Sequence, residues 1–154
     1  MAGRDKHPDK LWRISPFADL SGRGGVLASG RWHSAGRPVV YLAETPSGAM
    51  LETLVHLELD PEDLPDTYQL LRVDIPEECS VIDARELEAG WQEDYGLSQT
   101  IGNEWLAGGE SLLMRVPSAI VPHTRNYLLN PEHPEAAEVE FEAERWSFDK
   151  RLFK

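Results

Sequence analysis

Short apolar runs between turn residues predict several strands. Leu11–Ile14 and Thr67–Ile75 alternate apolar and polar residues, which is typical of strands. Pro38–Ala43 is β-branched and aromatic, and it predicts a buried strand that a proline enters. Ser111–Val116 is a further apolar run. Glu138–Phe148 alternates apolar residues with glutamates, the pattern of a strand with one solvent-exposed face.

The segment from Pro46 to about Leu57 predicts an amphipathic helix. Thr45 is suited to cap its first turn, in which proline is well tolerated. Glu52 and His56 are four residues apart and share the polar side of this helix. The apolar side consists of Met50, Leu51, Leu54, Val55 and Leu57.

The remaining pattern predicts a fold of the α+β class. Leu97–Ala107 predicts a second helix, ended by two glycines, and Ser21–Gly36 is a loop rich in glycine and serine. Strands and helices mix without the regular spacing of βαβ units, so we expect a compact mixed sheet with flanking helices. With 154 residues the chain has the length of one ordinary domain. We expect a polar tail over residues 1–10 and a single domain over 11–154.

The distribution of charge narrows the ligands that the protein can bind. A formal net charge of −12 argues against a protein that neutralises phosphates along DNA or RNA, and we expect no direct nucleic-acid ligand. The first 40 residues nevertheless hold seven Lys and Arg against three Asp, while the remainder holds eight basic and 24 acidic residues. Local arginines can bind a small phosphate-bearing ligand in such a protein, because a distant field is screened by salt.

The sequence favours a cytoplasmic protein. Met1–Lys10 is polar and lacks the apolar centre of a secretory signal, and no apolar run is long enough to span a bilayer. Cys79 is the only cysteine, so an internal disulfide and a thiolate metal cage are both excluded. We expect this thiol to be inert.

Common catalytic motifs are absent from the sequence. The chain has no phosphate loop, dinucleotide-binding glycine pattern, serine-hydrolase elbow or HExxH zinc helix. Its five histidines are scattered, and the nearest acid–histidine pair on a helix, Glu52 and His56, is of a kind that is more often solvent-exposed or hydrogen-bonded than bound to a metal. We therefore expect no metal. A pair of glycosidase carboxylates has no support, because any two acids would have to be chosen from 27.

Six short segments occur in a fixed order along the chain. They are Leu11-Trp12-Arg13, Gly30-Arg31-Trp32, Val39-Val40-Tyr41-Leu42-Ala43, Ala49-Met50-Leu51-Glu52, Val116-Pro117-Ser118-Ala119 and Asn126-Tyr127-Leu128-Leu129-Asn130-Pro131. Read together, they resemble the RES domain, the toxin of RES–Xre toxin–antitoxin systems. The family is named for an arginine, a glutamate and a serine, which fall here on Arg31, Glu52 and Ser118. The resemblance covers about Leu11 to Phe153, and one departure is His33, where many members are expected to have asparagine.

The resemblance implies a fold similar to ADP-ribosyltransferase toxins, with NAD as the substrate. It implies cleavage of the nicotinamide–ribose bond, which either destroys NAD or transfers ADP-ribose to an acceptor such as a protein. It also implies a partner, a helical DNA-binding antitoxin of the Xre type. None of this follows from composition or periodicity.

In that family context, Glu52, Arg31 and Tyr41 are the expected catalytic residues. Nicotinamide leaves as a neutral molecule and positive charge develops on the ribose, so one carboxylate, that of Glu52, can stabilise the transition state. Arg31 offers a planar fork of donors for the diphosphate, with Gly30 allowing close approach or merely a tight turn. Tyr41 is expected to stack on nicotinamide. Without the resemblance, Glu52 would be a solvated helix residue and Tyr41 a core residue.

Further NAD contacts are expected from Ser118, Arg13 and Asn126. Ser118 either hydrogen-bonds the ribose or is a turn serine, and with no base beside it a nucleophilic role is not favoured. Arg13 either adds a phosphate contact or pairs with a surface acid, and Asn126 orders the site. Trp12 and Trp32 are core or rim aromatics. His56 either orients Glu52 or faces water.

The sequence is also compatible with two other functions. The first is a non-enzymatic module whose acidic surface binds a basic partner, in which case binding would survive Glu52→Ala. The second is a metal-dependent nuclease that uses Glu52, His56 and other acids, in which case a chelator would stop activity on RNA or DNA.

Overall fold

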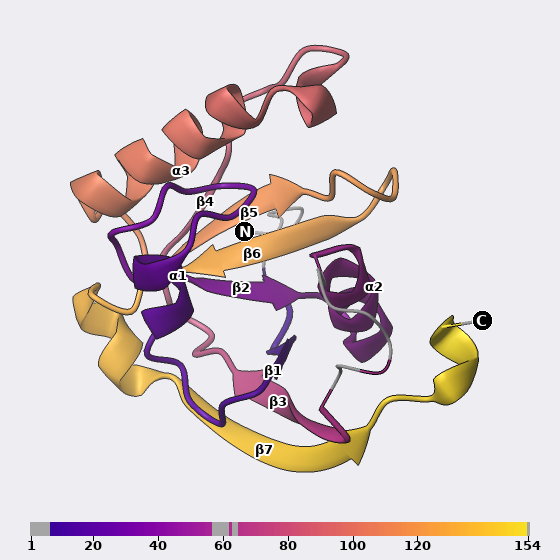
Figure 1. Ribbon diagram of the computed structural model, residues 1–154. Helices are drawn as coiled ribbons and strands as arrows, with labels where there is room; N and C mark the ends of the chain where they lie inside the picture. Colours follow the sequence, from indigo (N-terminus) through magenta and orange to yellow (C-terminus); the bar gives the residue numbers. More distant parts are fainter. Residues whose placement is uncertain (1–6, 57–61, 63–64, 154) are drawn as a thin grey trace.

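The computed structural model describes residues 7–56, 62 and 65–153, and its core is a seven-stranded sheet (Figure 1). The strands are β1 (Lys10–Ser15), β2 (Val40–Ala43), β3 (Thr67–Asp74), β4 (Val81–Asp83), β5 (Leu113–Pro117), β6 (Arg125–Leu129) and β7 (Glu140–Ser147). Their order is β4-β5-β6-β2-β1-β3-β7, and every neighbouring pair is antiparallel except β4 and β5. This mixed sheet confirms the predicted α+β class.

Helices flank the sheet as expected. The α-helices are α1 (Arg23–Leu27), α2 (Pro46–His56) and α3 (Tyr95–Gly108), and the 3-10 helices include η2 (Trp91–Glu93), η3 (Pro134–Glu138) and η4 (Lys150–Phe153). Figure 1 shows α3 along the side of the molecule that holds β4 and β5, whereas β7 forms the opposite edge of the sheet. The helix α2 follows β2 directly and contacts both β1 and β2.

The sheet consists of two halves that meet between β1 and β2. Those two strands are paired at a single position, Trp12 opposite Ala43. By contrast, β1 pairs with β3 over its whole length. On its other side, Ala43 lies opposite Asn126 of β6. Ala43 therefore links the two halves, and α2 begins a few residues after it.

Apolar side chains form two clusters, and β2 contributes side chains to both of them. Leu42 belongs to the first cluster together with Leu71 of β3. Tyr41 packs against the second cluster, which contains Trp32 from the loop before β2 and Trp105 from α3. Successive residues of a strand point to opposite faces, so β2 is covered on both sides. Of the predicted core or rim positions, Trp32 takes the core one, since it is 3% exposed, whereas Trp12 is only half-buried.

Most of the predicted elements are confirmed, including the cap of α2. The Thr45 hydroxyl accepts a hydrogen bond from the Gly48 amide at 2.9 Å. The helix α3 begins two residues earlier than expected and ends at Gly108, and the capping residue Gly109 has a left-handed φ of 61°. The predicted loop Ser21–Gly36 contains the short helix α1, which the glycine-rich composition concealed. Leu57 lies outside the described residues.

The apolar side predicted for α2 is wrong in part. Leu51 and Val55 are 36% and 55% exposed, while Ala49 is buried and Glu52 is half-buried. The Glu52 carboxylate bonds to groups on the sheet, so the helix presents this polar residue inward and turns Leu51 and Val55 toward solvent. A site contact has overridden the hydrophobic pattern.

The dry face predicted for the last strand is also wrong. All eight residues of β7 are exposed, including Phe141 at 37% and Trp146 at 55%. The cause is position: β7 is an edge strand that pairs only with β3. Charged residues on such an edge hinder pairing with another chain.

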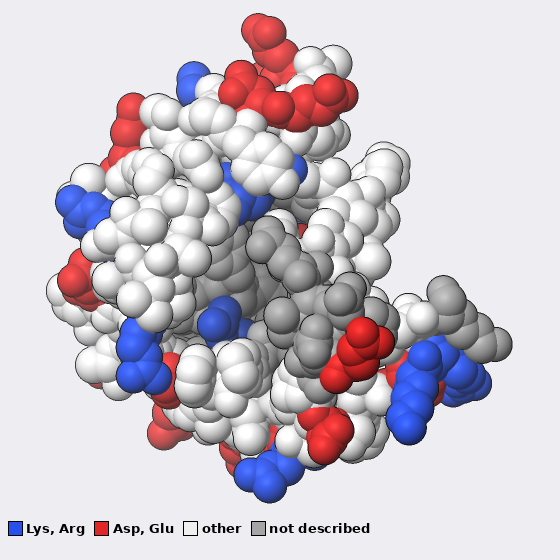
Figure 2. Space-filling view, viewed as in Figure 1, with Lys and Arg blue, Asp and Glu red and all other residues white. Residues whose placement is uncertain are grey.

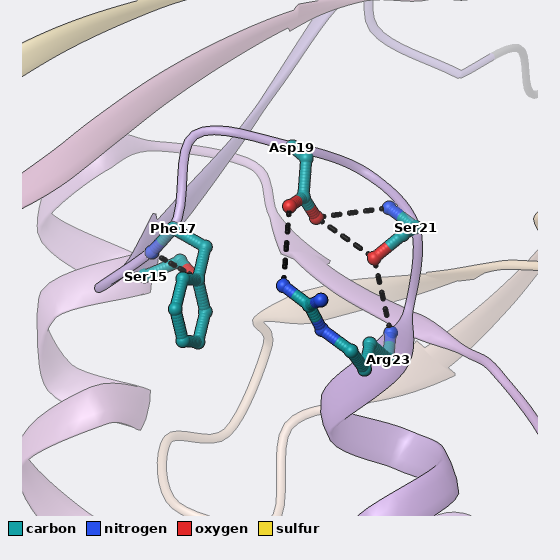
Figure 3. A network of polar contacts seen from close by, with 5 residues as sticks. All are labelled: Ser15, Phe17, Asp19, Ser21 and Arg23. Atoms are coloured by element: carbon teal, nitrogen blue, oxygen red, sulfur yellow. Dashed lines mark hydrogen bonds and ion pairs between the residues drawn. The ribbon is translucent and has the colours of Figure 1, made fainter.

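A compact turn leads from β1 into α1 (Figure 3). The Ser15 hydroxyl accepts from the Phe17 amide, and one Asp19 carboxylate oxygen accepts from both the amide and the hydroxyl of Ser21. These bonds from Ser21 hold the pKa of Asp19 below its ordinary value. The Arg23 guanidinium lies 3.8 Å from Asp19 and 5.2 Å from the centre of the Phe17 ring. The turn fixes where the chain enters the segment that carries Arg31.

The described end of the expected N-terminal tail is joined to the domain. The Asp9 carbonyl accepts from the Ile75 amide at 2.9 Å, and His7 Nε2 lies 3.4 Å from Cys79 Sγ. Lys10 is already the first residue of β1. Residues 1–6 lie outside the described residues.

Candidate active site

The Glu52 carboxylate is held by two hydrogen-bond donors that lie far from Glu52 in the sequence. The Ser118 hydroxyl donates to Glu52 Oε2 at 3.0 Å, and Asn126 Nδ2 donates to the same oxygen at 3.1 Å. Among the described residues, Oε1 has no hydrogen-bond partner. The carboxylate is thus held in one orientation through Oε2.

The sheet places both donors. Asn126 lies opposite Ala43, the last residue of β2, and α2 then carries Glu52 back toward that point. Ser118 directly follows β5, and its amide bonds to the Thr124 carbonyl in the connection to β6. The Ser118 hydroxyl also accepts from two amides of that connection, those of Ile120 and Val121. Ser118 is therefore a turn serine and a Glu52 donor at the same time.

Arg31 lies on a support formed by η2 and the start of α3. Its Nη1 donates to the Gln92 carbonyl at 2.7 Å. The guanidinium lies 3.8 Å from the centre of the Tyr95 ring and 5.9 Å from that of Trp91. These contacts fix the planar group without neutralising it, because in the described part of the chain no carboxylate is within ion-pair distance of Arg31. A fixed guanidinium without a counter-ion suits an anionic ligand.

The main chain around Arg31 is fastened to α3. The Ser98 hydroxyl donates to the Arg31 carbonyl at 2.6 Å, and Gln99 Nε2 donates to the Gly30 carbonyl at 2.9 Å. One turn later, a Cβ added to Gly102 would overlap the Trp32 carbonyl oxygen. Only glycine allows the helix to approach the loop this closely. The position of Arg31 thus depends on α3.

Tyr41 holds the same loop from the sheet. Its hydroxyl accepts from the Trp32 amide at 2.9 Å and lies 2.8 Å from His33 Nδ1. Burial raises the pKa of the phenol above its ordinary value, against smaller opposite effects of the Trp32 amide and the Arg31 charge. A Cβ on Gly30 would come within 2.6 Å of this hydroxyl. Gly30 therefore makes room for Tyr41, a reason that the sequence did not suggest.

Arg13 lies on β1 and reaches the strand that carries Tyr41. Its Nη1 donates to the Tyr41 carbonyl at 3.5 Å, where β1 and β2 diverge. Its Nε is buried and has no hydrogen-bond partner among the described residues. Burial lowers the pKa of this guanidinium, while Asp19 raises it. A buried cationic donor with an unmet hydrogen bond favours an anionic ligand over the surface ion pair that was the alternative.

The structure joins the predicted residues in two groups. Glu52, Ser118 and Asn126 are linked by direct hydrogen bonds, and Tyr41 is linked to the Arg31 loop and to Arg13. In contrast, His56 is exposed, and the groups that orient Glu52 come from the sheet. Figure 2 shows some Lys and Arg atoms near the centre of the viewed face, whereas most charged side chains of either sign lie toward its outline.

Sequence reasoning missed the residues that support Arg31. The support uses Gln92, Tyr95, Ser98, Gln99 and Gly102. The one usable signal was Gly102, since a glycine inside a predicted helix indicates a close packing contact.

The described residues contain no group of three or more His, Cys, Asp or Glu that could hold a metal ion. They also contain no helix that is both long and apolar enough to cross a membrane.

Comparison with known proteins identifies the family. The family model described as the RES domain matches residues 10–151. The chain belongs to the RES domain family. This match confirms the resemblance drawn from Arg31, Glu52 and Ser118, and it covers all seven strands and the helices that carry or support the site residues.

Curated relatives of this RES domain are named as toxins. "Toxin Res" of Pseudomonas putida is 54% identical over 143 residues, which are 93% of this chain and 99% of the relative. "Toxin Res" of Photorhabdus laumondii is 41% identical over 83% of this chain and 78% of its own length. "Prs ADP-ribosylating toxin" of Sphingobium is 33% identical over 94% of this chain and 96% of its own length.

Proposed function

We propose that this RES domain is the toxin of a bacterial type II toxin–antitoxin pair and that it cleaves the nicotinamide–ribose bond of NAD in the cytoplasm. The names of the relatives support the toxin role, and one of them is named for ADP-ribosylation, a reaction that starts with this cleavage. The observation that carries the chemistry is the Glu52 carboxylate, held through Oε2 by two donors with Oε1 unbonded among the described residues.

The reaction asks little of the protein beyond positioning and charge. Nicotinamide departs as a neutral molecule, so the leaving group needs no acid. The ribose carbon develops positive charge, which a fixed carboxylate stabilises without having to reorient. In this proposal, Glu52 Oε1 faces the ribose, accepts a hydrogen bond from a ribose hydroxyl and stabilises the oxocarbenium-like centre, while Ser118 and Asn126 keep it in place.

The two cationic groups account for binding of the diphosphate. Arg31 presents a fixed guanidinium, and Arg13 has an unmet donor beside β2. Tyr41 contacts both Arg13 and the loop that carries Arg31, and in this proposal its ring stacks on the nicotinamide. NAD is thus a substrate, and the mechanism requires no metal.

The acceptor of ADP-ribose is water, phosphate or a protein side chain. Water or phosphate gives depletion of NAD, and a side chain gives protein ADP-ribosylation. The name of the Sphingobium relative supports the second outcome for that protein. Both begin with release of nicotinamide, so a single assay covers both.

The test is to incubate the purified protein with NAD and measure free nicotinamide. Glu52→Gln keeps an oxygen for the Ser118 and Asn126 donors but removes the charge, so turnover should fall roughly a hundredfold or more with little change in NAD affinity. Glu104→Gln, on the exposed side of α3, is the matched control. No nicotinamide release by the wild type, or a folded Glu52→Gln protein with normal release, contradicts the proposal.

The partner in this proposal is an Xre-type antitoxin that blocks the anion site. A carboxylate or chain terminus of the partner can form charge-assisted hydrogen bonds with Arg31, and it would then exclude the NAD phosphates by competition. Antitoxin affinity should fall when a non-cleavable NAD analogue is present at saturation. Unchanged affinity would mean that the partner acts from another surface.

A further inference from the structure

The loop that carries Arg31 is a tight hairpin whose shape depends on few contacts. The Gly30 amide donates to the His33 carbonyl at 3.0 Å, and the two residues form an isolated β-bridge with Arg31 and Trp32 between them. One side of the loop is fastened to α3 through Ser98 and Gln99. The other side rests on a buried relay of side chains.

The relay runs from α1 to the Trp32 amide through two side chains. His33 is 2% exposed, and its Nε2 lies 3.0 Å from the Gly25 carbonyl. Because a carbonyl only accepts, Nε2 carries the proton, and Nδ1 of the neutral ring is left as an acceptor. The Tyr41 hydroxyl donates to this Nδ1 at 2.8 Å and accepts from the Trp32 amide.

We infer that His33 and the Tyr41 hydroxyl are positioning residues that hold Arg31 in place for its ligand. The inference rests on the proposed NAD function and adds a second role to Tyr41, that of its hydroxyl rather than its ring. Trp32 directly follows Arg31, so an amide anchored at Trp32 fixes the main chain from which the guanidinium projects. A buried amide without an acceptor would be unfavourable, so loss of the hydroxyl should shift the loop.

His33 ties this loop to α1 as well as to the sheet. An asparagine at the same position can offer its Oδ1 to Tyr41 in place of Nδ1, but it is too short to reach the Gly25 carbonyl at the same time. The acceptor for Tyr41 is therefore the part of His33 that matters most for Arg31. The contact with Gly25 adds the connection to α1.

Three variants separate the hydroxyl from the ring. Tyr41→Phe keeps the stacking ring and removes the hydroxyl, His33→Leu removes the acceptor, and His33→Asn retains it. With nicotinamide release as the assay, Tyr41→Phe and His33→Leu should each raise KM for NAD by roughly five- to tenfold, the effect of one lost hydrogen bond, with a smaller change in kcat. The KM of His33→Asn should stay within about twofold of the wild-type value, because asparagine retains the acceptor. His56→Asn, at an exposed histidine, is the matched control.

The coupling of the two side chains gives a second criterion. If they act as one relay, the double variant Tyr41→Phe, His33→Leu should be no worse than either single variant. Multiplying effects would show that they act separately, and an unchanged KM in folded Tyr41→Phe would show that only the ring matters. Either result overturns the inference.

Hydrogen exchange of the Trp32 amide provides a readout that does not depend on NAD. In Tyr41→Phe this amide should exchange at least tenfold faster by NMR, with the core amide of Leu113 as the internal reference. His33→Asn should keep its protection. If the wild type releases no nicotinamide but the Trp32 amide behaves as described, the proposed function fails while the relay stands. Equal exchange in the wild type and Tyr41→Phe rejects the relay itself.

Discussion

The hydroxyl of Ser118 donates a hydrogen bond to Glu52 Oε2 across 3.0 Å, although 66 positions separate the two residues in the chain. The side-chain amide of Asn126 donates to the same oxygen, so the carboxylate is oriented by a serine in a turn and an asparagine on a strand. This arrangement gives the serine of the family name a role that needs no nucleophilic chemistry. It also sets the size of the effect expected when the serine is removed.

Ser118→Ala should lower kcat for nicotinamide release by about tenfold, because one charge-assisted hydrogen bond that orients Glu52 is lost. Asn126→Ala should have a similar effect, since it removes the second donor. A loss with Ser118→Ala as complete as that of Glu52→Ala, with Asn126→Ala nearly normal, would instead support a direct chemical role of Ser118. Circular dichroism of each variant controls for folding of the turn.

Arg31→Lys should not rescue NAD binding. A lysine cannot reproduce the planar fork, the stacking on Tyr95 or the bond to Gln92 in the same geometry. We expect affinity for a non-cleavable NAD analogue to fall by roughly tenfold or more in both Arg31→Lys and Arg31→Ala, as measured by calorimetry. Arg37→Lys, at an exposed arginine six residues further along the chain, should bind normally. Wild-type affinity in Arg31→Lys would show that a simple positive charge is sufficient.

Two glycines of α3 provide a matched pair for the packing of the Arg31 loop. Gly102→Ala places a Cβ against the Trp32 carbonyl and should lower the free energy of unfolding by about 2 kcal/mol or more. Gly108→Ala, in the same helix with open space around it, should be neutral or stabilising by up to about 1 kcal/mol. Denaturant unfolding measures both. Equal stability of the two variants would contradict the close contact between α3 and the loop.

Cys79 should react slowly with alkylating reagents. Burial, with a smaller contribution from the Glu135 charge, raises the pKa of its thiol from 9.0 to about 11. At pH 8 the reactive thiolate should therefore be about a hundredfold rarer than in the unfolded chain. The iodoacetamide rate should rise to its midpoint near pH 11 in the folded protein and near pH 9 in urea. Equal midpoints would mean that the thiol is not buried.

Because the pKa of Cys79 is raised, the free energy of unfolding should depend on pH. The folded state favours the neutral thiol, so Cys79 stabilises the folded state fully at pH values below the unfolded pKa of about 9. Its contribution declines as the pH rises from there through about 11. Cys79→Ser should flatten that part of the stability profile, which urea titrations at pH 8 to 11 can record.

The sequence determined the elements that depend on nearby residues. The helix that carries Glu52 begins at Thr45 and Pro46 as predicted, because a cap and a first-turn proline act within one turn. The strand that carries Tyr41 follows from its β-branched residues. The family pattern supplied Arg31, Glu52 and Ser118, and the family match confirms that membership.

Only the tertiary structure decided how these residues meet. The bonds of Glu52 depend on Asn126 lying opposite Ala43 and on a turn after β5, and such register is set by pairing across the whole sheet. The exposed Leu51 and Val55 show the same point, because a contact to the sheet outweighed the apolar pattern of α2. Likewise Gly30 and Gly102 are required by Tyr41 and Trp32, neighbours that no local pattern reveals. Local propensity acts over a few residues, whereas the site is defined by contacts between segments far apart in the chain.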